Sequence, residues 1–266
     1  MKPRASGITI RKPISRTTTI VLGIAVWVVF FLAWHIAVVT ESVNTLLVPA
    51  PGTVLATIVN LVIEGDFLKD IGISIYRILV SFWLACAVAV PIGILMGTYA
   101  RTEAFVNSFV SAWRYLPAPA FIPILLMWLG TGEGPKIALL FIGVVFFLIT
   151  LIMDYTKQVR IELIETSLTL GASENQVLRS VIIPAVMPNI ITAMRQMLAV
   201  SWTYLVIAEI VASTTGIGAM MMRARRFLHT DEIMAGIVII GMLGLLFDLL
   251  FRWLHRVLFS YLYEQN

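Results

Sequence analysis

The feature that most limits the fold of this chain is a set of apolar stretches as long as a lipid bilayer is thick. From Thr17 to Thr40, and again between Arg77 and Arg101, the sequence contains no Asp, Glu, Lys or Arg. A helix needs about 20 apolar residues to cross the roughly 30 Å hydrocarbon core. With 59% hydrophobic and 13% charged residues over 266 positions, the chain is typical of an all-α membrane domain and not of a soluble protein.

About six membrane-spanning helices are predicted, because backbone groups in lipid must bond within the protein. The expected spans are residues 19–40, 78–100, 104–129, 136–153, 188–211 and 233–251. A polar segment, 41–70, separates the first two. The expected division is an N-terminal tail (1–18), one transmembrane domain (19–256) and a C-terminal tail (257–266).

The third predicted span is irregular. Pro117, Pro119 and Pro123 each remove a backbone donor, so a continuous helix is not expected there. Broken backbone at membrane depth is tolerated where protein covers it or where it lines a cavity. We therefore expect residues 104–129 to be shielded from lipid.

Charge predicts the orientation. With both termini in the cytoplasm, eleven of the 19 Lys and Arg residues lie inside and five outside, with the other three at or within span edges. The exception is Arg223, Arg225 and Arg226, which this topology places outside. These three arginines are candidates for the outer mouth, where they would attract an anion or contact an acidic partner. The alternative is a surface charge run neutralised by Asp231 and Glu232.

A polar segment at about 155–187 interrupts the spans and has helical spacing. Ile161, Ile164 and Leu168 recur on one helical face. Gly171 then breaks the pattern, and Ser173 with Gln176 forms a capping box that restarts a helix. Two short helices joined by a hinge are expected, with Pro184 ending the second. The alternative is an amphipathic segment that rests on lipid headgroups.

Longer motifs resemble a known family. Arg114-Tyr-Leu-Pro-Ala-Pro-Ala-Phe-Ile-Pro, the turn Trp128-Leu-Gly-Thr-Gly-Glu133, Leu170-Gly-Ala-Ser and Thr215-Gly-Ile-Gly218 resemble the permeases of ABC importers, in the nitrate, sulfonate, taurine and bicarbonate branch. The likeness covers about residues 20–255. It departs at Thr166 and Ser167, where two alanines are usual, at Phe121 for Trp and at Ala118 for Pro. These departures leave the substrate open.

The resemblance implies a type I importer permease fold that works as two copies in the inner membrane. The 155–187 segment would be the coupling loop that grips a cytoplasmic ATPase subunit, and a periplasmic or surface-tethered binding protein would deliver the substrate. The implied coupling residues are Glu165, Leu168, Gly171, Ala172, Ser173, Val181, Ile183 and Pro184. The chain contains no phosphate-binding Gly-x-x-x-x-Gly-Lys-Ser/Thr loop, so ATP and Mg²⁺ are expected on the partner subunits and no cofactor or metal on this chain.

Polar residues within the spans are candidates for the substrate path. Arg195 and Glu209 are 14 residues apart and share one face of the fifth span, which would point to the dimer axis or to a neighbouring helix. Arg195 is also explained by snorkelling to the membrane surface, and Glu209 by pairing with another helix. Ser201 and Thr203 offer hydroxyl donors or pack against other helices. Arg114 precedes the proline-broken segment and is a path candidate or an interfacial anchor.

Other functions find less support. No zinc-protease or serine-hydrolase motif is present, so an intramembrane enzyme is disfavoured. A secondary transporter driven by an ion gradient predicts two related halves, and no such duplication is visible. The basic residues form no stripe typical of nucleic-acid binding. The single Cys86 leaves no disulfide or cysteine metal site.

Overall fold

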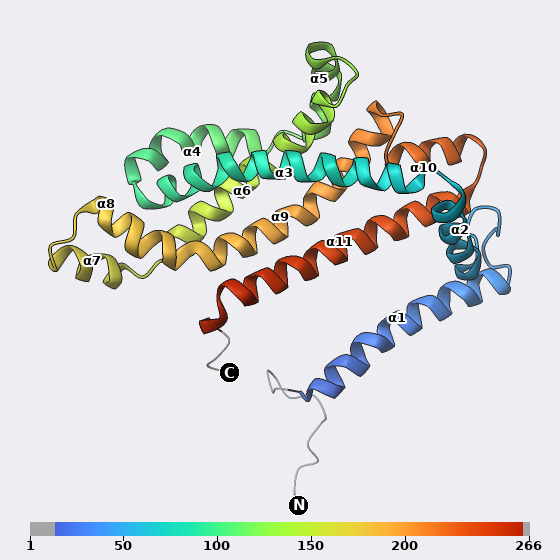
Figure 1. Ribbon diagram of the computed structural model, residues 1–266, viewed down its shortest axis with the longest axis horizontal. Helices are drawn as coiled ribbons and strands as arrows, with labels where there is room; N and C mark the ends of the chain where they lie inside the picture. Colours follow the sequence, from blue (N-terminus) through green and yellow to red (C-terminus); the bar gives the residue numbers. More distant parts are fainter. Residues whose placement is uncertain (1–13, 263–266) are drawn as a thin grey trace, which may run out of the picture.

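A computed structural model describes residues 14–262 of the chain. The basic residues Lys2, Arg4, Arg11 and Lys12, on which part of the predicted orientation rests, lie outside the described residues. All regular structure among residues 14–262 is helical (Figure 1). The all-α prediction is therefore confirmed.

The helices follow one another with short connections. In chain order they are α1 (Arg16–Val39), α2 (Pro51–Glu64), α3 (Phe67–Thr98), α4 (Ala100–Arg114), η1 (Ala118–Phe121), α5 (Ile122–Leu129), α6 (Gly134–Lys157), α7 (Ile161–Thr169), α8 (Glu174–Val177), η2 (Leu178–Ile182), α9 (Ile183–Ala212), α10 (Ile217–Arg226), α11 (Thr230–Leu258) and η3 (Ser260–Leu262).

Five helices among the described residues are long and apolar enough to cross a membrane, and there are six if one bent helix pair is counted as a single span. The bent pair is α4 with residues 118–129, which meet at 84°. The break falls at the predicted prolines, so the predicted interruption of the helix within residues 104–129 is confirmed; by length and composition the pair is a broken span or a re-entrant loop. Met127 and Trp128 on α5 are exposed in the single chain.

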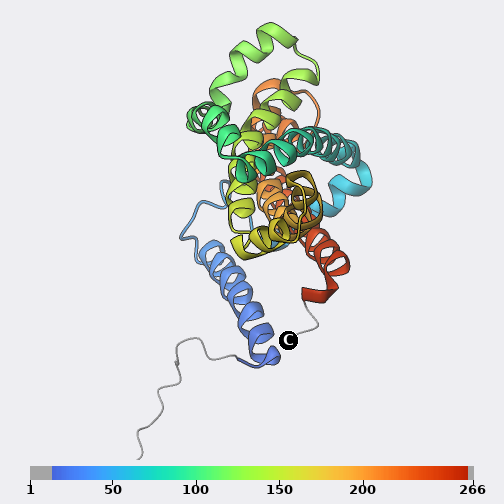
Figure 2. The same ribbon diagram turned by 90° about the vertical axis from the view of Figure 1, so that its left-hand side faces the viewer.

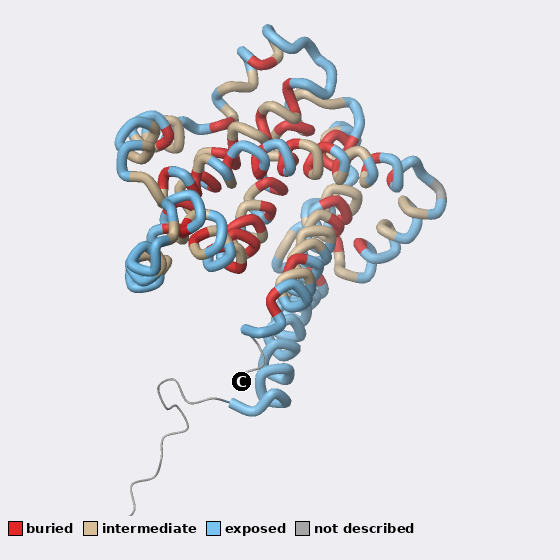
Figure 3. Tube along the Cα trace, turned by 60° about the vertical axis from the view of Figure 1, so that its left-hand side comes forward, coloured by how far each residue is buried: buried red, intermediate tan, exposed pale blue. Residues whose placement is uncertain are grey.

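The core forms where α3, α6 and α9 pack together, and buried residues concentrate there (Figures 1 and 3). Small residues allow α3 and α6 to approach closely. A Cβ added at Gly93 would lie 2.7 Å from the Ile152 Cβ, and one at Gly97 would collide with Thr156. Close packing at glycines four residues apart is a recurrent way for membrane helices to associate.

Helix α1 stands apart from this core. It runs beside the bundle (Figure 2), and Val38 is its one buried residue. Trp34 of α1 donates a hydrogen bond of 3.1 Å from its Nε1 to the carbonyl oxygen of Pro49, in the connection to α2. Most of its apolar surface is therefore free to contact lipid or another protein.

One predicted boundary is wrong. The helix of the second span begins at Phe67 and not at 78, and the segment 41–70 before it includes the helix α2. The helix extends because its polar residues Asp70, Ser74 and Arg77 have buried partners. The bundle has two ends (Figure 1): α7, α8 and the end of α11 lie at one, called the α8 end, and α2 and α10 lie at the other, called the α10 end.

Candidate functional site

The segment between α6 and α9 folds into two short helices, as predicted. Helix α7 ends in a Schellman arrangement: the Gly171 N–H donates to the Leu168 carbonyl at 2.9 Å, and the Ala172 N–H donates to the Ser167 carbonyl at 3.0 Å. Gly171 has a φ of +90°, which glycine adopts without strain. The predicted capping box is confirmed, with both the Ser173 and the Gln176 bonds present. We call residues 161–177 the elbow.

Pro184 does not end the second helix, and this prediction is wrong. Residues 174–212 run as one helical rod, in which the π-helical turn η2 precedes Pro184. Proline lacks an N–H and clashes with the carbonyl four residues earlier. The wider π turn at Leu178–Ile182 relieves that conflict. The elbow is therefore joined directly to the span α9.

The elbow presents a mixed surface at the α8 end. Of the predicted coupling residues, Glu165, Leu168, Gly171, Ser173 and Pro184 are exposed, and Ala172, Val181 and Ile183 are half-buried. A hollow of about 300 Å³ lies between α7, α8 and the ends of α3 and α6. Exposed apolar side chains, above all Leu170 at 83%, leave this surface suited to a protein contact.

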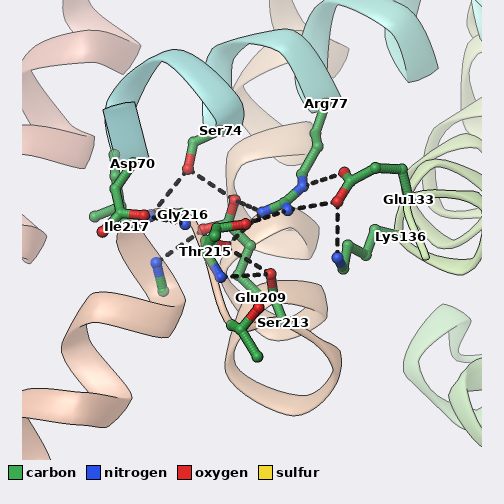
Figure 4. Close-up of polar contacts among 12 residues, drawn as sticks. Asp70, Ser74, Arg77, Glu133, Lys136, Glu209, Ser213, Thr215, Gly216 and Ile217 are labelled. Atoms are coloured by element: carbon green, nitrogen blue, oxygen red, sulfur yellow. Dashed lines mark hydrogen bonds and ion pairs between the residues drawn. The ribbon is translucent and has the colours of Figure 1, made fainter. Parts of the chain in front are cut away.

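A buried ion network lies at the α10 end, centred on Arg77 (Figure 4). The Arg77 side chain is 0% exposed. Its Nε and Nη2 donate to the two oxygens of Glu133 at 2.6 and 2.8 Å, and its Nη1 donates to Glu209 Oε1 at 2.7 Å. The Thr215 carbonyl and hydroxyl accept two further bonds. Every guanidinium nitrogen therefore has a partner, as a buried charge requires.

Glu209 connects the end of α9 to the loop before α10. Its carboxylate, 0% exposed, accepts from the Ser74 hydroxyl at 2.7 Å and from the Gly218 N–H at 2.8 Å. Ser74 in turn accepts from the Ile217 N–H at 3.0 Å. Gly216 has a φ of +105°, and a Cβ there would collide with Glu209 and Arg77. Only glycine fits between the loop and this charge pair.

Two further ion pairs complete the network. Asp70 accepts from the Gly216 N–H at 2.6 Å and from Arg223 Nη2 at 2.7 Å. Lys136 donates to Glu133 at 2.9 Å. The network thus balances three carboxylates with three bases, and it joins α3, α6, α9 and α10 at one end of the bundle (Figure 4).

Arg223 differs from its two neighbours. All three arginines are exposed on α10, but Arg223 also donates to Asp70 and to the Thr214 carbonyl. Asp231 accepts from Thr57 and Glu232 bonds His229. The neutralisation of Arg223 by Asp231 and Glu232, expected as an alternative, is therefore not what the structure shows.

The other path candidates are not brought together. Glu209 is enclosed by the network, while Arg195 lies 3.5 Å from Asp248 of α11. The buried Ser201 hydroxyl donates to the Met197 carbonyl, and Thr203 is exposed. Arg114 lies over the Tyr115 ring, 5.5 Å from its centre. No cluster suited to a metal ion occurs among residues 14–262.

Sequence reasoning missed Asp70, Ser74, Arg77 and Glu133 as members of one network. The signal was present: Asp70, Ser74 and Arg77 are spaced by four and three residues, which places them on one helical face. The partners of Asp70, Ser74 and Arg77 lie 56 to 153 positions away in the sequence, for the bonds described. Helical periodicity alone does not identify such partners.

Acid should weaken the link between Glu133 and Arg77. Hydrogen bonding from Arg77 lowers the pKa of the Glu133 carboxyl from 4.5 to about 2. Its contribution to stability is complete above pH 4.5 and is lost as the pH falls towards 2. The Tm difference between the wild type and Glu133→Gln should therefore be widest above pH 4.5 and shrink below it. A difference that is constant from pH 6 to 3 would contradict this assignment.

Comparisons with known proteins agree with this architecture. The sequence pattern of the family described as "binding-protein-dependent transport system inner membrane component" matches residues 89–260, well over half of the chain. The chain belongs to this family. It is a membrane-embedded permease component of an ABC transporter, which confirms the resemblance seen in the sequence.

Individual relatives of this permease are similar over nearly their full length. It is 32% identical to the putative aliphatic sulfonates transport permease SsuC of Bacillus subtilis, over 90% of this chain and 87% of that one. It is 31% identical to the taurine transport system permease TauC of Escherichia coli, over 92% and 90%. The fold also matches an inward-facing MetNI methionine ABC transporter, with a TM-score of 0.64 at 20% identity over 71% of this chain and 94% of that one.

Proposed function

We propose that this chain is the permease subunit of an ATP-driven importer for a small anion of the sulfonate, taurine, nitrate or bicarbonate class. The observation that carries the proposal is the elbow, a rigid polar unit that is continuous with a membrane-spanning helix. Similarity to permeases named for sulfonates and taurine supports the substrate class.

The elbow would seat in a cytoplasmic ATPase subunit that holds ATP and Mg²⁺. Because α8, η2 and α9 form one rod, a displacement of the elbow would move α9 and, through Glu209 and Arg77, the α10 ends of α3 and α6. The α8 end would face the cytoplasm and the α10 end the binding protein. Arg225 and Arg226 remain candidates for contact with that protein or its anion.

A second copy of the chain would complete the path. Helix α1 is exposed along its length, and the proline-broken segment exposes Met127 and Trp128 in the single chain. Irregular backbone at membrane depth needs protein cover. A homodimer would supply that cover and bring two copies of the candidate path residues Arg114, Ser201 and Thr203 towards one axis, whereas the path candidate Arg195 is paired with Asp248 of α11.

Reconstitution of the complex in liposomes tests the proposal. The chain, its ATPase and its binding protein should accumulate radiolabelled taurine, an alkanesulfonate, nitrate or bicarbonate only when ATP is supplied on the ATPase side. The chain alone should hydrolyse no ATP. Uptake that persists without ATP and follows an ion gradient would support a secondary transporter and overturn the proposal.

A further inference from the structure

A second polar hollow lies at the α8 end, between α9 and α11. It encloses about 310 Å³, and its lining includes Arg195 from α9 together with Arg252, His255 and Arg256 from α11. Ile191 and Phe251, both buried, also line it. The hollow is therefore apolar in part and cationic in part.

The charges in this hollow favour an anion. Asp248 accepts from Arg252 Nε at 2.6 Å and lies 3.5 Å from Arg195 Nε. The single carboxylate of Asp248 thus interacts with the guanidinium groups of Arg195 and Arg252, which leaves a net charge of +1 on these three side chains. Arg256 and His255 line the same space. Guanidinium groups that converge on a hollow are suited to the oxygens of a phosphate.

Apolar residues lie beside the hollow, and along α11 they precede its basic residues. Leu245, Leu249, Arg252 and Arg256 follow one another at spacings of four, three and four residues, so they lie on one stripe of α11. Leu245 and Leu249 line an apolar hollow of about 380 Å³, which also includes Ile71 of α3. A ligand with an anionic head and apolar chains fits this order along the helix.

We propose that this hollow binds the phosphate headgroup of an acidic phospholipid, with the acyl chains along the Leu245–Leu249 part of α11. Arg252 lies directly after the apolar part of the span, at the depth of the headgroups. Basic pockets between spanning helices recognise acidic lipids in this way. In the orientation given under the proposed function, this hollow faces the cytoplasmic leaflet, so the assignment of the leaflet rests on the proposed function. The chemistry of the site does not depend on that orientation.

Native mass spectrometry of the detergent-solubilised permease–ATPase complex tests the proposal. Titration with phosphatidylglycerol should give tight adducts, whereas phosphatidylcholine should bind weakly. Each arginine near an anionic headgroup contributes about a fivefold gain in affinity. The double variant Arg252→Gln/Arg256→Gln should therefore bind phosphatidylglycerol about 25-fold more weakly, and Arg252→Lys/Arg256→Lys should retain most of the affinity.

Two controls separate this result from loss of fold and from a free anion. Arg225→Gln/Arg226→Gln, at the α10 end, changes the charge equally and should leave phosphatidylglycerol binding unchanged; each variant should keep the wild-type Tm in detergent. Inorganic phosphate at 10 mM should not displace the lipid. Equal binding of both lipids, unchanged binding by the Arg252/Arg256 variant, or displacement by phosphate would each overturn the lipid assignment. Failed uptake with intact lipid binding would count against the proposed function alone.

Discussion

Replacing Arg77 with methionine is expected to lower the Tm of the purified permease by on the order of 10 °C, the largest effect among single substitutions in the ion network. The change leaves the buried Glu209 carboxylate without its cation and removes both bonds to Glu133. Loss of one partner of a buried ion pair costs about 3–5 kcal/mol, because the other charge stays buried and uncompensated. Each kcal/mol corresponds to about 2–4 °C for a chain of this size.

The control variants distinguish the buried charge from simple loss of an arginine. Arg225→Met, on the exposed part of α10, should leave the Tm within about 2 °C, as expected for surface substitutions. Arg77→Met/Glu209→Gln should regain part of the lost stability, because the orphaned carboxylate is gone. An Arg77→Met protein as stable as the wild type would show that the network does not hold the α10 ends together.

Replacing Gly171 with arginine is expected to abolish ATP-driven uptake while the protein still inserts and folds. Gly171 is exposed at the tip of the elbow, with no atom within 4 Å of an added Cβ. A long cation there would obstruct the partner surface. Loss of about 3 kcal/mol in an interface hot spot weakens docking by roughly 100-fold. Uptake into liposomes and co-purification of the ATPase measure the effect.

Gly130→Arg provides the matched control for Gly171→Arg. Gly130 also has a positive φ, +73°, and open space around its Cβ, but it lies before the start of α6, far from the elbow. A side chain at a positive φ is strained in both variants, and with φ +73° and ψ −161° Gly130 lies in a region that is essentially restricted to glycine, so Gly130→Arg should lose at least as much stability as Gly171→Arg. Normal uptake by Gly171→Arg, or equal loss of uptake in both variants, would argue against docking at the elbow.

The sequence predicted the parts of the fold that depend on local pattern. Span lengths, the proline break and the Ser173–Gln176 capping box each follow from residues within a few positions of one another. The path of the rod through Pro184 does not, because the π turn at Leu178–Ile182 accommodates the proline and lets the helix continue. Pro184 alone predicts a helix end.

The ion network is a second part of the structure that the local sequence pattern does not predict. Arg77 directly precedes an uncharged apolar stretch, a position typical of residues at the edge of a membrane span. Its burial depends on Glu133, Glu209 and the loop before α10, which the fold brings to it from other helices. Glu209 is unusual in the sequence because it lies within a span, but the sequence pattern does not identify Arg77 as its partner. A single sequence does not show which residues far apart in the chain pair with one another.

The most direct test of the central claim is the accessibility of the elbow from each side of the membrane. In a Cys86→Ser background, which removes the single cysteine, Leu170→Cys and Phe227→Cys place one thiol at each end of the bundle on side chains 83% and 72% exposed. Leu170→Cys should react with an impermeant maleimide only in inside-out vesicles, and bound ATPase should protect it. Phe227→Cys should react only in right-side-out vesicles. Labelling of Leu170→Cys from the outside, or no protection by the ATPase, would contradict the proposal that the elbow carries the motion of the ATPase into the membrane.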